Sequence, residues 1–375
     1  VKRLTALGRP EDLFVAYEAG PTGYGLYRRF TAAGISCMVV APSKTPRRPG
    51  EKVKTDRLDA QRLARYLRAG ELTAVTPPGR EQEALRDALR AREDAVRALR
   101  RARQQLSGFL LRHDRRWMER TTWGTKHMEW IRSQRFDSEI QRQVLEDYYR
   151  EVARLEDRVK GWDADVARFA ESCTQTLSLY RALQALRGVS TIVAATLVAE
   201  IGDLRRFARA SHLMSYLGLS PSEHSSGSKV SRGAITKAGN THVRYKLVQA
   251  AWNYRHRAAM TKTLKERQDG LPKSVCDIAW QAQKRLNRKY SVMMARGKRP
   301  QTTVVAVARR EQRLNRLIEQ TRDAAGRIIA FPGDITDPET RSGVMHCAGD
   351  LGQGRLDLLV NNAGIGAIGP FADAS

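Results

Sequence analysis

The sequence predicts an α/β domain followed by a mostly α-helical region and a final segment of different character. Three observations lead to this expectation: short apolar runs alternate with helix-like segments over residues 1–75, seven-residue apolar repeats follow over residues 80–172, and the charge balance changes near residue 308. Alternating strand and helix patterns are typical of a parallel or mixed sheet, whereas heptad repeats are typical of paired long helices.

The first domain, residues 1–78, is expected to contain two strands and two helices. The apolar runs at residues 13–17 and 35–41 are short enough to be buried strands, and residues 20–25 and 42–50 are expected to be a turn and a basic loop. Helical patterns cover residues 24–33 and 56–67, and each is followed by a glycine that can end a helix, Gly34 and Gly70.

Residues 79–175 are expected to form a coiled-coil arm of two long helices. The apolar positions of the first helix are Leu85, Leu89, Val96, Leu99, Leu106 and Leu110, and those of the second are Val152, Leu155, Val159, Trp162, Val166 and Phe169. Such spacings of three and four predict a helical hairpin. The arginines around the first stripe either face solvent or contact nucleic acid or another copy of the chain; they are Arg97, Arg100, Arg101 and Arg103.

Residues 176–308 are expected to be a compact helical unit with a polar, Gly/Ser-rich insertion at residues 220–239. Its last part, residues 262–308, is basic, and its expected anchors are Trp280, Leu286 and Tyr290. The turn at Gly188 precedes an apolar helix that runs towards Gly202. This turn either presents backbone amides to a phosphate or joins two packed helices.

The charge of the chain predicts a polyanionic partner. The sequence contains 66 Lys+Arg and 40 Asp+Glu, a net charge of +26. Of these, 58 and 31 lie in the first 308 residues, which therefore carry +27. Counterion release drives the binding of such chains to nucleic acid. Four scattered cysteines, no apolar stretch of about 20 residues and no signal peptide predict a protein of the reducing cytoplasm without a membrane span.

Three carboxylates form the first candidate site. Glu18 lies at the end of the first expected strand, and Asp56 and Asp59 share one face of the following helix. Clustered carboxylates can hold Mg²⁺ ions that promote phosphodiester chemistry. The alternative is that both aspartates stabilise the start of their helix.

The second candidate site is the loop around Ser226. Ser225, Ser226 and Gly227 are followed by basic residues that include Lys229, Arg232, Lys237 and Arg244. An exposed serine in such a loop can act as a nucleophile on a phosphate. The alternative is a solvated loop that binds phosphate without reacting.

These residues resemble the motifs of the DEDD-type insertion-sequence transposases, the group of RNA-guided bridge recombinases. The similar stretches are Tyr17–Gly23, Lys54–Ala60 and Ser225–Gly227, and the resemblance covers residues 10–308. It implies an RNase H-like (RuvC-type) domain, a helical domain with a serine, site-specific cleavage and rejoining of DNA, a noncoding guide RNA and a homo-oligomer, dimer or tetramer. If the family's residue roles are transferred to this chain, the resemblance implies that Glu18, Asp56 and Asp59 bind Mg²⁺. It also implies that Ser226 is the nucleophile, with Ser225 as the second choice.

One departure from the family pattern concerns the start of the chain. The family carries its first catalytic Asp on a strand well upstream of the residue equivalent to Glu18. Residues 1–17 have no matching strand, and Asp12 is too close to Glu18 to replace that residue. The expectation is therefore an N-terminally truncated RNase H-like domain, and the alternative function is a catalytically inactive remnant that binds nucleic acid.

The last segment, residues 309–375, resembles a short-chain dehydrogenase. It contains Asp334, Asp337 and an apolar run that ends in Asn361–Gly364. A Gly-rich dinucleotide-binding turn and a Tyr-x-x-x-Lys pair are absent from it, which predicts an incomplete Rossmann-like tail without dehydrogenase activity. Residues 305–311 are compatible with a last transposase helix or with a strand of the dehydrogenase.

Overall fold

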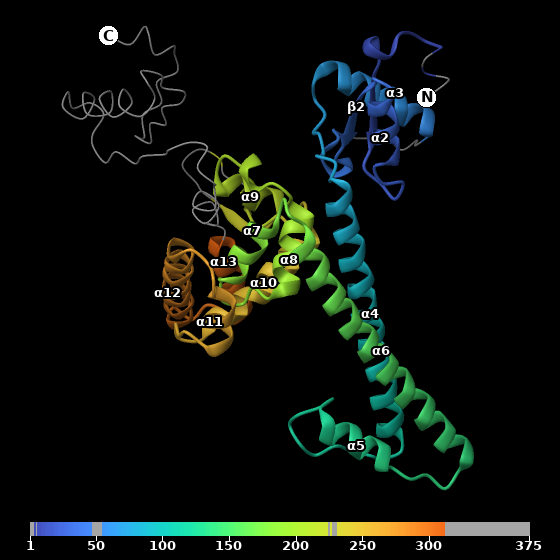
Figure 1. The fold of residues 1–375 in the computed structure, drawn as a ribbon, viewed down its shortest axis with the longest axis vertical. Helices are drawn as coiled ribbons and strands as arrows, with labels where there is room; N and C mark the ends of the chain where they lie inside the picture. The colour runs from blue at the N-terminus through green and yellow to red at the C-terminus, as the bar shows by residue number, and fades with distance from the viewer. Residues whose placement is uncertain (1–3, 5, 47–54, 224–225, 227–230, 312–375) are drawn as a thin grey trace, which may run out of the picture. The chain divides into compact units, whose positions relative to one another are not determined.

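The computed structural model describes residues 4, 6–46, 55–223, 226 and 231–311 (Figure 1). The chain divides into two compact units, residues 1–321 and 322–375, and every described residue belongs to the first. The described part is mostly helical, with two small sheets. None of its helices is long and apolar enough to cross a membrane.

The N-terminal sheet is parallel, as the alternating pattern predicts. Strand β1 (Phe14–Glu18) pairs with β2 (Ser36–Val40) in a register that joins Phe14 to Ser36 and Glu18 to Val40. Residues 73–75 continue this sheet on the other side of β2, where Val40 bridges Ala74 in an antiparallel sense. The two predicted strands are therefore confirmed to within one or two residues.

Two helices pack on this sheet and end where their glycines predict. Helix α2 (Gly25–Ala32) contacts β2, and α3 (Asp56–Ala69) contacts β1. Gly34 and Gly70 have φ of +75° and +72°, a left-handed conformation that glycine adopts without a steric penalty. The loop predicted at residues 42–50 begins with a short 3₁₀ helix, Pro42–Lys44, and its residues 47–50 lie outside the described part.

The predicted arm is formed by α4 (Arg80–Arg112) and α6 (Glu139–Ser172), which lie side by side (Figure 1). Five of the six predicted apolar positions of α4 are buried, and the sixth, Val96, is half-buried. Ala95 and Ala102 are buried as well, and their small side chains let two helices approach closely. Arg103 of α4 pairs with Glu156 of α6 at 2.6 Å.

A short helix that the sequence pattern did not predict, α5 (Thr125–Ser133), lies between the two arm helices in the chain. It belongs to a group of aromatic side chains in which Trp117, Trp123 and Trp130 surround His127. The rings of His127 and Trp130 are stacked, with centroids 5.7 Å apart. This group packs on the same core cluster as Phe109, Phe136 and Leu106.

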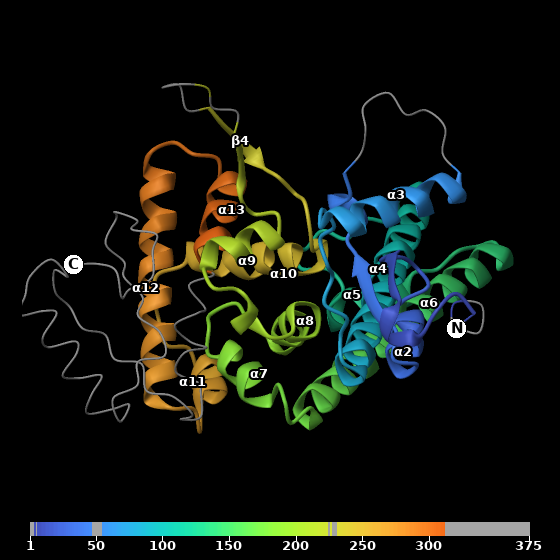
Figure 2. The same ribbon diagram turned by 90° about the horizontal axis from the view of Figure 1, so that it is seen from above.

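The helical unit that follows is built around one buried helix, α8 (Thr191–Ile201), in which every residue from 193 to 201 is buried. This helix contacts α4, α6, α7 (Leu177–Gln184) and α10 (Thr241–Ala251), and Figure 2 shows α9 (Ala210–Tyr216) in the same unit. The later helices are α11 (Lys262–Gln268), α12 (Lys273–Ala295) and α13 (Pro300–Glu311). The 3₁₀ helices besides the one named above are Pro10–Asp12, Leu204–Arg206 and Trp252–Arg255.

The turn at Gly188 joins packed helices. Gly188 has φ of +84°, and a Cβ atom added there would lie 2.4 Å from the carbonyl oxygen of Ala250 in α10. The backbone of the turn therefore approaches α10 too closely for any other residue. This contact supports the packing interpretation of the Gly188 turn over a phosphate-binding role.

Residues 305–311 are helical, so the helix alternative is confirmed for this segment and the dehydrogenase strand is not formed there. Helix α13 lies beside α12 and contacts α10 (Figure 2). Val304, Val307 and Ala308 are fully buried in a cluster with Tyr254 and Leu286. Leu286 is thus an anchor as predicted, and Tyr290 packs against the same cluster. The predicted motifs at Asp334 and at Asn361–Gly364 lie outside the described residues.

Candidate active site and nucleic-acid interface

The three predicted acidic residues lie on two elements that contact each other. Glu18 is the last residue of β1 and is exposed, and the Thr45 hydroxyl lies 3.5 Å from its Oε1 atom as a donor. Asp56 is the exposed first residue of α3, and Asp59 follows one turn later, half-buried. The contact between α3 and β1 places the helix with the two aspartates beside the strand that ends in Glu18.

The first turn of α3 also explains the two aspartates as helix stabilisers. Thr55 is the N-cap, and its hydroxyl accepts a hydrogen bond of 3.3 Å from the Leu58 amide. Carboxylates in the first turn interact favourably with the helix dipole, and Asp59 also lies 3.7 Å from Arg62. These contacts support the helix-stabilising role of the two aspartates.

The carboxylates do not form a ready metal site. Among the described residues, no group of three or more His, Cys, Asp or Glu side chains is arranged to hold a metal ion. Carboxylate oxygens are the donors that Mg²⁺ prefers, so the donor set fits the ion, whereas the arrangement does not bring all three donors together. The metal role of Glu18, Asp56 and Asp59 therefore stays a prediction.

The predicted serine lies in the connection of a β-hairpin. Strand β3 (Pro221–Glu223) pairs antiparallel with β4 (Arg232–Ile235). Ser226, between these strands, is exposed, as a nucleophile requires. Ser225 and Lys229, named with it in the sequence, lie outside the described residues.

Two glycines hold the base of this hairpin. Gly218 has φ of +64°, and a Cβ atom there would lie 1.9 Å from the Ala238 carbonyl oxygen. Gly239 has φ of +88°, and its Cβ atom would lie 2.0 Å from the Tyr216 carbonyl oxygen. The backbone segments before and after the hairpin thus touch directly, which fixes where the serine loop leaves the helical unit.

We predict that Gly239→Ala destabilises the protein much more than the same change at Gly270. Gly270 also has positive φ, +70°, but nothing lies within 4 Å of the point that a Cβ atom would occupy there. Both changes add the strain of a left-handed alanine, about 1–2 kcal/mol. Gly239→Ala adds overpacking, so its loss in the free energy of unfolding should be larger by about 1–3 kcal/mol. Urea unfolding of both variants measures the difference, and equal losses would contradict the close contact.

A buried charge network lies next to the hairpin, and sequence reasoning missed it. Glu200 of α8 is buried, and its carboxylate lies 3.2 Å from Arg90 and 3.9 Å from Arg86, both in α4. Asn240 donates a hydrogen bond of 2.9 Å to Glu200 and accepts one of 3.0 Å from the Val243 amide, which caps α10. The signal in the sequence is an acidic residue inside an otherwise apolar helix, because buried charges need partners.

Side chains of α4 also form hydrogen bonds with the C-terminal end of α8. Arg86 donates to the carbonyl oxygens of Ala199 and Glu200 at 2.6 and 3.1 Å, and Gln82 donates to that of Ala199 at 2.8 Å. The last carbonyl groups of a helix have no partner within the helix, so these side chains replace water there. As a result, α4, α8 and Asn240, the residue before α10, are joined in one hydrogen-bonded network.

Part of the predicted basic loop is structural. Arg244 donates a hydrogen bond of 2.7 Å to the carbonyl oxygen of Leu217, and burial lowers the pKa of its guanidinium. Burial, followed by repulsion from Arg92, lowers the pKa of Lys246 in the same helix. Lys237 is exposed instead, with φ of +56°, and stays available to a phosphate.

A strongly basic chain with an exposed serine hairpin, and with acidic residues beside a parallel sheet, fits the class of proteins that act on nucleic acid. Comparison with known proteins gives the family. Residues 3–113 match a DEDD transposase domain, a kind of domain that generally depends on divalent metal ions, and residues 180–266 match the transposase IS116/IS110/IS902 family.

Two relatives cover most of the chain. A putative transposase of Sinorhizobium fredii is 43% identical over 309 residues, which is 82% of this chain and 75% of the relative. The transposase for insertion sequence element IS1533 of Leptospira borgpetersenii is 32% identical over 296 residues, 77% of this chain and 84% of the relative. The chain therefore belongs to the IS116/IS110/IS902 family of transposases, and like other transposases it binds DNA.

The C-terminal region is similar to a different family. Residues 293–375 match short-chain dehydrogenases. The ketoacyl reductase HetN of Nostoc is 36% identical over 90 residues, which is 24% of this chain and 31% of the relative. The family match begins within α12, although α12 and α13 pack as parts of the transposase unit.

Proposed function

We propose that the protein cleaves and rejoins DNA through a transient covalent link to Ser226, in a reaction that depends on Mg²⁺. The observation that carries the proposal is the exposed serine on a hairpin whose base is fixed by the contacts of Gly218 and Gly239. A fixed hairpin base limits where the serine can meet a phosphate, and such positioning favours the reaction.

The proposed step is a phosphoryl transfer. Ser226 Oγ attacks the phosphorus of a DNA phosphodiester, an Oγ–P bond forms and the bond from phosphorus to a deoxyribose oxygen breaks. The serine proton leaves, and the departing oxygen ends as a hydroxyl group. A deoxyribose hydroxyl of the new partner strand then attacks the phosphoserine, which restores a phosphodiester and the free serine.

In this proposal Glu18, Asp56 and Asp59 belong to an RNase H-like domain, and their carboxylates would hold Mg²⁺. The parallel β1–β2 pair with α2 and α3 supports this fold, and the DEDD match over residues 3–113 supports the role. A bound Mg²⁺ supplies charge stabilisation at the phosphate. The three carboxylates would be the side chains that hold the ion.

Asp59→Asn is the test of this metal role. We expect the change to weaken binding of Mn²⁺, used as a spectroscopic substitute for Mg²⁺, by at least about 10-fold, because one charged ligand is lost. Asp12→Asn, a change in the exposed 3₁₀ helix before β1, is the matched control and should leave Mn²⁺ binding unchanged. Equal Mn²⁺ binding by both variants would remove Asp59 from the metal site.

The remaining parts of the proposal follow from the family resemblance. A noncoding RNA would direct the protein to its DNA sites, and the basic first 308 residues, with a net charge of +27, supply the attraction for both polymers. The working form would be a dimer or tetramer, acting in the cytoplasm where its DNA is found. Co-purification of RNA with the protein tests the first point. The mass of the protein in light scattering tests the second.

A further inference from the structure

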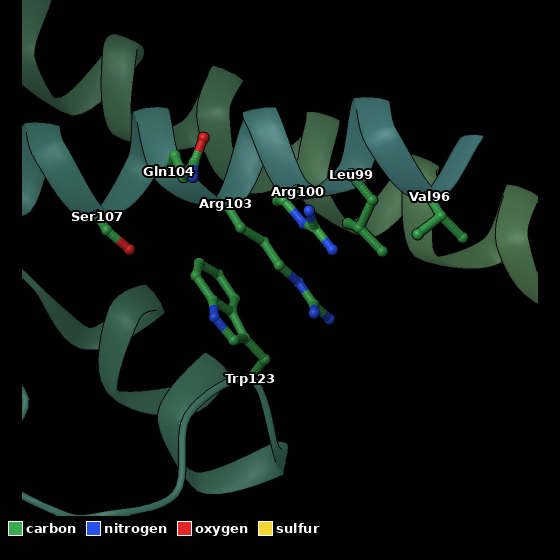
Figure 3. Close-up of a pocket in the computed structure, with 7 residues that line it drawn as sticks. All are labelled: Val96, Leu99, Arg100, Arg103, Gln104, Ser107 and Trp123. Carbon is green, nitrogen blue, oxygen red and sulfur yellow. The ribbon is translucent and has the colours of Figure 1, made fainter. Parts of the chain in front are cut away.

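A hollow of about 470 Å³ lies on one side of the arm (Figure 3). Seven side chains line it, six of them on one face of α4 and the seventh from the loop before α5: Val96, Leu99, Arg100, Arg103, Gln104, Ser107 and Trp123. Its volume falls within the range of small-molecule sites, about 300–1,000 Å³. Nothing in the proposed cleavage reaction uses this hollow.

The lining combines flat, cationic and polar groups. The guanidinium of Arg103 lies over the ring of Trp123, 4.9 Å from its centroid, and Figure 3 shows the two side chains next to each other. Arg100 is exposed, and no carboxylate in the described part of the chain pairs with it. The exposed Gln104 and Ser107 add groups that can donate and accept hydrogen bonds.

Trp123 is held in an unusual backbone conformation at this hollow. Its φ is +63°, which is rare for a bulky residue, and its amide donates a hydrogen bond of 2.9 Å to His127 Nδ1. Burial, followed by the charge of Arg103, lowers the pKa of His127, so the ring is neutral and Nδ1 can accept. Strained residues of this kind occur where a protein holds a side chain ready for a ligand.

We propose that the hollow binds one unpaired nucleotide of a nucleic-acid strand. Its base lies against the pair that Arg103 and Trp123 already form, Gln104 and Ser107 contact the edge of the base, and Arg100 binds its phosphate. Stacking on aromatic rings and guanidinium planes is the usual way that proteins hold unpaired bases. A paired base is enclosed in its stack and cannot enter, so the site selects single strands over duplexes. This inference rests on the proposed nucleic-acid function and extends it.

The test compares two variants of equal charge on one helix. Arg100→Glu alters the hollow, whereas Arg101→Glu makes the same change at an exposed position that does not line it. Anisotropy titrations use single-stranded DNA, single-stranded RNA and duplex DNA of one sequence. Arg100→Glu should weaken single-strand binding at least about 10-fold more than Arg101→Glu, as the loss of a charged hydrogen bond predicts. Duplex binding should fall equally in both variants.

Substitutions of Trp123 test the stacking directly. Trp123→Ala should weaken single-strand binding by about 5- to 150-fold, and Trp123→Phe should restore most of it, because a stacking ring remains. In the unmodified protein, photo-cross-linking of an iodouracil-substituted strand should reach the peptide that contains Trp123. This measurement does not depend on the folding of a variant. The oligonucleotide that shows the larger Arg100 effect identifies the strand as RNA or DNA.

Equal effects of Arg100→Glu and Arg101→Glu on single strands, or cross-links confined to other peptides, would overturn the proposal. The result is separate from that of the serine mechanism, because covalent joining of Ser226 to duplex DNA is measured without single strands. If no covalent adduct forms at Ser226, but Arg100→Glu still weakens single-strand binding more than Arg101→Glu does, only the cleavage mechanism is refuted.

Discussion

Replacing Ser226 with alanine should abolish the covalent protein–DNA adduct that this transposase forms on its donor DNA. The adduct exists because the serine oxygen becomes bonded to phosphorus, and alanine has no oxygen to form that bond. Radiolabelled DNA that migrates with the protein on a denaturing gel measures the adduct. Duplex binding should persist, because Ser226 is exposed and carries no charge.

Ser225→Ala and Ser228→Ala are the controls, and each should retain at least part of the adduct. Each of them also removes one hydroxyl oxygen from this loop. They therefore separate the chemistry of the Ser226 hydroxyl from the general properties of the loop. An adduct that survives in Ser226→Ala but disappears in Ser225→Ala would move the nucleophile to Ser225. An adduct present in all three variants would exclude a serine mechanism at this hairpin.

DNA affinity should fall about 1,000-fold or more between 50 and 200 mM salt, as expected for roughly six to ten phosphate contacts. The reason is the net charge of +27 on residues 1–308, which releases condensed counterions when the protein binds. A filter-binding titration across that range measures the slope of affinity against salt. A flat slope would show that these charges do not meet the DNA.

One pair of variants can localise the contacts. Lys237→Gln removes an exposed charge at the base of the serine hairpin and should reduce the slope by about one. Arg150→Gln removes an exposed charge of α6 that is paired with Glu146 at 2.6 Å, so it should leave the slope unchanged. An equal reduction in both variants would mean that the DNA does not prefer the hairpin.

Local patterns in the sequence were enough to predict most elements of the fold. The apolar runs of β1 and β2 and the repeats of α4 and α6 depend on neighbours along the chain, so their periodicity is visible in the sequence. The glycines that end α2 and α3 act within one turn of their own helices. The nine-residue helix α5 was not predicted, because it lies in the connection between the apolar stripes of α4 and α6 and carries no part of either stripe.

The candidate site could be predicted only in part, because its geometry depends on contacts between distant residues. The motifs indicated Ser226 and the three acids, but the sequence did not show that β3 and β4 form a hairpin whose base needs Gly218 and Gly239. Glu200 meets Arg90 across 110 positions of the chain, and no local pattern indicates that pairing. The strained backbone of Trp123 likewise depends on its bond to His127.

The network around Glu200 limits how this protein can be recombined with its relatives. A chimera that takes α8 from this protein and the start of α4 from a relative leaves Glu200 without a partner wherever that relative lacks the residues equivalent to Arg86 and Arg90. A buried charge that loses its partner costs about 3–5 kcal/mol, a large share of the stability of an ordinary domain. Between parents that differ at these positions, exchange of the serine-bearing unit therefore requires the first three turns of α4 to be exchanged as well, although Arg86 and Glu200 are 114 positions apart in the chain.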